Sequence, residues 1–92
     1  MVYNRLILFT SYYFASKMEN LAKEARFSVQ LIPTPASLSH ACGMCIICQE
    51  EELSQLVSVM KQNGISHSGI YQFNGPHQKV YKLPLKGIID EL

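Results

Sequence analysis

The chain has few charged residues, and its basic residues form no cluster. Aspartate, glutamate, lysine and arginine make up 16% of its 92 residues, whereas soluble domains usually contain ~25%. A low charge content favours an apolar surface and self-association. The lysines and arginines are scattered along the chain, but proteins that bind nucleic acids gather them on one face. We therefore expect no nucleic-acid partner.

Long apolar runs are also absent, and cysteines are few. No run of ~18 apolar residues occurs, so we expect no transmembrane helix and no membrane partner. The start, MVYNRLILF, is not followed by a small-residue cleavage site, which argues against a signal peptide. The three cysteines all lie between Cys42 and Cys48. Such an odd, clustered set is not a disulfide scaffold, and a reducing, cytoplasmic setting is expected.

What the chain does contain is a regular succession of apolar patterns. Ser11 is suited to cap the first helix. His67 is expected in a solvated turn before the last strand. The clearest helix carries an apolar stripe at helical spacing, made of Leu53, Leu56, Val57 and Met60. We expect strands at residues 5–9, 27–32, 44–48 and 68–73, and helices within residues 12–25 and 49–64.

This β-α-β-β-α-β order predicts an α+β, ferredoxin-like sandwich, with two helices on one face of a four-stranded antiparallel sheet. Residues 1–73 form the predicted domain, and residues 74–92 a C-terminal extension that is an extra edge strand or an arm. Because such a sheet leaves an edge or face to be covered, we expect a homo-oligomer, most simply a homodimer. About eleven residues link the second and third strands, and unusually long loops of this kind tend to be functional.

That link leads into the spacing C-x2-C-x2-C, with His40 two residues ahead of Cys42. An iron–sulfur cluster needs a fourth thiolate, which the chain lacks. His40 and the three cysteines would suit zinc, but Cys45 and Cys48 should point to opposite faces of a strand, so zinc is the weaker alternative. A Cys42–Cys45 disulfide requires a bend at Gly43, because three extended residues span ~10 Å and bridged Cα atoms lie within ~7 Å.

The three cysteines are therefore expected to have different roles. Cys45 and Cys48 are most simply small buried residues of a strand. Cys42 precedes Gly43 at the junction of loop and strand, where a glycine permits a turn whose backbone N–H groups converge on the sulfur. Such a turn, with His40 nearby, would favour the reactive thiolate. Further hydrogen bonds are expected from Thr34, Ser37 and Ser39.

The segment LIPTPASLSHACGMCI, followed by a Glu-started helix and NGISHSGIY, resembles the selenium/sulfur carrier protein-like family. The resemblance covers about residues 4–73. Its most specific part is the Leu-Ile-Pro-Thr-Pro run, then a Ser-rich turn and Cys-Gly, so that Cys42 matches the cysteine of the family. The chain departs from the family at His40 and Ala41, which are often serine there, and at Cys45 and Cys48, where apolar residues are more usual.

The resemblance implies a small carrier without turnover of its own. It would hold sulfur or selenium on Cys42 as a persulfide or selenopersulfide, with no other cofactor, between a desulfurase-type donor and an acceptor protein. The alternative is a non-catalytic module that binds a small ligand or dimerises, since the fold alone does not fix function. That alternative predicts structural cysteines, a buried Cys42 and a ligand pocket lined by residues 32–43.

Overall fold

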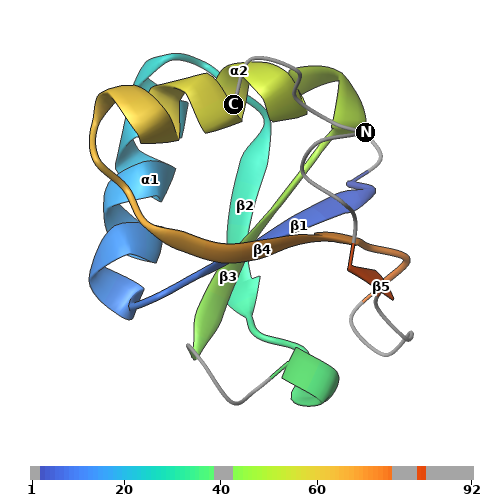
Figure 1. Ribbon diagram of the computed structural model, residues 1–92. Coiled ribbons are helices and arrows are strands. Elements are labelled where there is room, and N and C mark those ends of the chain that lie inside the picture. Colours follow the sequence, from blue (N-terminus) through green and yellow to red (C-terminus); the bar gives the residue numbers. More distant parts are fainter. Residues whose placement is uncertain (1–2, 39–42, 76–80, 83–92) are drawn as a thin grey trace.

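A computed structural model of the protein describes residues 3–38, 43–75 and 81–82. The predicted ferredoxin-like order is confirmed, and a short fifth strand is added (Figure 1). Neighbouring strands are antiparallel in the sheet order β2-β3-β1-β4-β5. Within the described residues, no helix is long and apolar enough to cross a membrane. The elements are β1 (Arg5–Phe9), α1 (Tyr12–Glu24), β2 (Val29–Pro33), the 3₁₀ turn η1 (Ala36–Leu38), β3 (Met44–Cys48), α2 (Glu50–Gln62), β4 (His67–Gln72) and β5 (Tyr81–Lys82).

The sheet is apolar on both faces. Alternate side chains of a strand point to opposite faces, so Ile7 of β1 packs toward the helices while Leu6 packs on the face that the helices leave free. Both are 0% exposed. We call the second group the helix-free cluster, and its buried members are Leu6, Leu8, Leu38, Cys45, Ile47 and Phe73. Burial on both faces explains why β1 and β3 read as unbroken apolar runs.

Helix α1 has defined ends. The Ser11 hydroxyl accepts a hydrogen bond from the N–H of Phe14 at 3.4 Å, as predicted for an N-cap. At the other end Arg26 has a φ of 67°, and the Phe27 N–H donates to the Ala22 carbonyl at 2.9 Å. This is a Schellman cap. Because Phe27 completes the cap and the Ser28 N–H donates to Glu52, β2 begins at Val29 rather than at the predicted residue 27.

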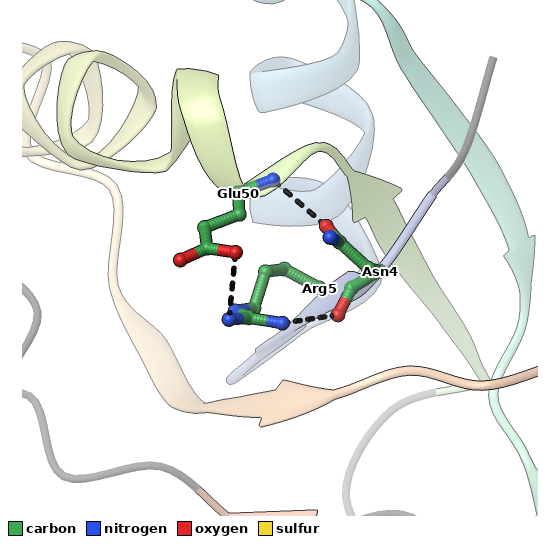
Figure 2. Close-up of polar contacts among 3 residues, drawn as sticks. All are labelled: Asn4, Arg5 and Glu50. Carbon is green, nitrogen blue, oxygen red and sulfur yellow. Dashed lines mark hydrogen bonds and ion pairs between the residues drawn. The ribbon is translucent and has the colours of Figure 1, made fainter.

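Helix α2 is capped from another strand. Gln49 holds the N-cap position but makes no side-chain cap bond. Instead the Asn4 Oδ1, just before β1, accepts the N–H of Glu50 at 2.8 Å (Figure 2). Arg5 lies beside this bond, with its Nη2 3.2 Å from the Glu50 carboxylate and its Nη1 donating to the Asn4 carbonyl at 2.8 Å. These contacts fix the end of β3 against the start of β1.

Candidate functional site

The segment between β2 and β3 is held at both of its described ends. The Thr34 N–H donates to the Gly43 carbonyl at 3.0 Å, which extends the β2–β3 ladder one step beyond the pair Pro33–Met44. Beyond Thr34 the chain turns through η1, where the Leu38 N–H donates to the Pro35 carbonyl at 2.8 Å. The Leu38 side chain is 6% exposed and packs into the helix-free cluster. These contacts fix the geometry of the loop mouth, where η1 follows the end of β2 (Figure 1).

Two of the six candidate site residues, Thr34 and Gly43, are described in full, and the ladder places them opposite each other. Ser37 lies on η1, but its side chain is outside the described part of the structure, as are Ser39, His40 and Cys42. Gly43 is exposed, and a Cβ built on it would meet no atom within 4 Å. The residue that directly follows Cys42 therefore faces open space.

Thr34 carries an unusual polar group. Its hydroxyl oxygen is shielded from solvent and has no hydrogen-bond partner within the described structure. A buried polar group left in this way costs roughly 1–3 kcal/mol. Because Thr34 is bonded through its backbone to Gly43, this unpaired hydroxyl lies at the base of the cysteine loop.

Cys45 and Cys48 lie on opposite faces of the sheet, as the strand period predicts. Cys45 belongs to the helix-free cluster and Cys48 to the core under the helices. Both are 0% exposed. A zinc ion cannot be bound by both thiols while β3 keeps this pairing, so the four-ligand zinc site with His40 and Cys42 does not fit the strand.

The Cys48 thiol is held in its protonated form. Burial, reinforced by the nearby Glu52 carboxylate, raises its pKa from 9.0 to about 12, although Arg5 acts in the opposite direction. Thiol nucleophilicity requires the thiolate. Cys48 is thus unreactive at neutral pH, in agreement with its predicted packing role.

The prediction that His67 is a solvated turn residue is wrong. His67 is the first residue of β4, pairs with Phe9 and is half-buried. Burial lowers its pKa below the ordinary 6.5, so the imidazole is neutral at physiological pH. Leu8 pairs with both Cys45 and Gly69, so the starts of β3 and β4 lie at the same end of the sheet. No sequence pattern indicates the burial of His67, because that burial depends on which strands pair.

A cavity of about 630 Å³ opens on the helix-free side of β2. It is lined by residues 32–36 together with Gln30, Ile47 and Phe73. Part of the segment between β2 and β3 thus lines a pocket, as the ligand-binding alternative predicted for residues 32–43.

Comparison with known proteins identifies the family. No curated protein and no solved structure matches the chain. The model of the family described as "Putative Se/S carrier protein-like" matches residues 4–72. That range contains β1 to β4, both helices and the whole cysteine loop. The chain therefore belongs to the Se/S carrier protein-like family.

Proposed function

We propose that the protein carries sulfur or selenium on Cys42, as a persulfide or selenopersulfide, between a donor and an acceptor protein. The observation that carries the proposal is that the two cysteines the structure describes, Cys45 and Cys48, are both fully buried. Cys42 is thus the remaining thiol of a chain whose family is named for selenium and sulfur carriage.

The transfer step requires one thiolate and no external oxidant. The Cys42 thiolate attacks the terminal sulfur of a donor persulfide, R–S–SH. The new S–S bond forms as the old one breaks, which leaves Cys42–S–SH and the donor thiolate R–S⁻. In the second step a nucleophile of the acceptor takes the terminal sulfur and Cys42 leaves as a thiolate. A selenopersulfide follows the same exchange.

Two described groups at the end of the sheet where β3 begins suit this chemistry. The Thr34 hydroxyl has an unused donor at the base of the loop, where a hydrogen bond to a thiolate or persulfide would favour the charged form. His67 is a neutral imidazole at the end of the sheet where β3 begins. A neutral imidazole can accept the thiol proton at physiological pH. We assign these roles as part of the proposal.

The test is adduct mapping by intact mass and peptide mass spectrometry. The reduced protein is incubated with glutathione persulfide or with glutathione selenopersulfide, GS–SeH, and then desalted. We expect the gain of one sulfur or selenium atom, located on the peptide that contains Cys42, and return of the original mass after treatment with dithiothreitol.

Matched variants separate the three thiols. Cys42→Ser should abolish the adduct, whereas Cys45→Ala and Cys48→Ala should retain it, provided circular dichroism shows that each is folded. An adduct that persists in Cys42→Ser, or that forms on Cys48 in the folded protein, would contradict the proposal. A parallel alkylation with iodoacetamide should label Cys42 alone in the native state and all three thiols in denaturant.

A further inference from the structure

We propose that the cavity beside β2 is a binding site for an uncharged, elongated and largely apolar small molecule. This assignment does not depend on sulfur chemistry at Cys42. The cavity, of about 630 Å³, is within the range of roughly 300–1,000 Å³ that is typical of small-molecule sites.

The shape of the site follows from the strand that borders it. Gln30, Ile32 and Thr34 alternate along β2 and the step beyond it, so they share the helix-free face. All three line the cavity, and Ile47 of β3 lies directly across from Gln30. The distance from Gln30 to Thr34 along the strand is roughly 13 Å. A ligand that contacts both Gln30 and Thr34 is therefore elongated.

The chemistry of the lining selects the ligand class. No charged side chain is among the lining residues that the structure describes, so a charged ligand would lose its hydration without a partner. Ile32, Ile47 and Phe73 supply apolar contact. Gln30 and Thr34 are the polar side chains of the lining. An uncharged molecule with an apolar body and one hydrogen-bonding group fits these walls best.

A peptide strand is a poorer occupant than a small molecule. The Thr34 N–H points to β3, because it donates to Gly43. Backbone direction alternates along a strand, so the nitrogen of Pro33 faces the outer edge, where it has no hydrogen to donate. An added strand would find outward N–H groups only at Val29 and Leu31 within β2. This edge is therefore poorly suited to strand addition.

A second copy of the chain is also a poorer occupant. Outside the cavity the helix-free cluster is already covered, because Leu6, Leu8 and Cys45 are at most 1% exposed. A stable protein interface needs an accessible patch of roughly 800 Å² on each partner. The large apolar side chains that are exposed among the described residues, Tyr12 and Tyr13, lie on α1 and not on this face, which argues against a broad docking face beside the cavity.

The test is a fluorescence titration with N-phenyl-1-naphthylamine, an uncharged apolar probe. We expect saturable binding of one probe per chain, with displacement by 1-decanol. Decanoate should compete at least about tenfold less well, because the lining offers no cation. Equal or better competition by decanoate, or binding that does not saturate, would overturn the assignment.

Two variants fill the cavity from opposite ends at exposed positions. Ala36→Trp and Gln30→Trp should each weaken probe binding about tenfold or more, since a large side chain then occupies the site. Ala25→Trp, at an exposed position after α1, is the matched control and should leave binding unchanged. Unchanged binding in both filling variants would overturn the proposal, as would a concentration-dependent dimer, seen by sedimentation, that both variants abolish.

Discussion

The Cys48 thiol makes protein stability depend on pH in the alkaline range. In the unfolded chain it ionises near its ordinary pKa of 9.0, whereas in the folded protein the pKa is about 12. Above pH 9 the unfolded state therefore binds fewer protons, and the free energy of unfolding falls with rising pH by up to about 1.4 kcal/mol per pH unit. Below pH 9 the ionisation of this group has no effect on stability. Urea denaturation at about pH 8 and about pH 10.5 measures the loss.

Cys48→Ala is the comparison for this prediction. It lowers the stability near neutral pH, because it leaves a small cavity, but it removes the contribution of the thiol to the alkaline slope. Parallel pH profiles for the two proteins would show that Cys48 already titrates at an ordinary pKa.

Thr34 is predicted to be a destabilising residue. Thr34→Val keeps the branched shape and removes the unpaired hydroxyl, so the free energy of unfolding should rise by about 1 kcal/mol. Thr10→Val is the matched control, because the exposed Thr10 hydroxyl donates to the Ser66 carbonyl at 3.5 Å, and its replacement should change stability by less than about 0.5 kcal/mol. A loss of stability in Thr34→Val would mean that the hydroxyl has a partner.

The same variant should also slow persulfide formation if the proposed donor role holds.

At the scale of elements, the two helices end in the same motif with different residues. Arg26 and Gly64 both have positive φ, 67° and 65°, and each is followed by a residue that closes a Schellman bond. For a residue with a Cβ this backbone conformation costs about 1–2 kcal/mol of conformational free energy, whereas glycine adopts it freely. Arg26→Gly should therefore stabilise the protein by up to about 1 kcal/mol, since the side chain is exposed.

Gly64→Ala is the reciprocal change and should destabilise by about 1 kcal/mol. A Cβ at Gly64 would meet no atom within 4 Å, so the effect reports the backbone alone. Thermal unfolding of both variants checks the pair. Changes of the same sign would refute the conformational explanation.

The elements differ in how far the sequence predicts them. For β1 and β3 the predicted and observed bounds agree, because Thr10 follows the apolar run of β1, and Gly43 and Gln49 flank that of β3. The predicted start of β2 was two residues early. Phe27 is apolar and fits the strand pattern, but its N–H closes the cap of α1. The periodicity of apolar residues does not show a hydrogen bond of this kind.

At the scale of the whole molecule, the sheet is the centre of two cores. Leu6→Ala should therefore lower the free energy of unfolding by about 2–5 kcal/mol, as the same change does for a residue under the helices. Leu56→Ala, in the helix-side core at 1% exposure, provides the comparison with the same atoms removed. Denaturant titration measures both, and a cost below about 1 kcal/mol for Leu6→Ala would contradict burial of the helix-free cluster.

The candidate site was predictable only in part. Strand alternation was enough to assign Cys45 and Cys48 to opposite faces, because it depends on position alone. The unpaired hydroxyl of Thr34, the burial of His67 and the cavity beside β2 depend on which strands become neighbours. Periodicity along the chain does not show which strands become neighbours, so these features become visible only in the folded structure.

The cap of α2 has a consequence for the order of folding. Asn4 and Glu50 are 46 positions apart in the chain, whereas an ordinary N-cap is adjacent to its helix and forms with it. The first turn of α2 thus gains its cap only after β1 has docked, at the cost of closing a long loop. We infer that the start of α2 and the start of β1 form and open together, as one cooperative unit, rather than as a local helix that folds first.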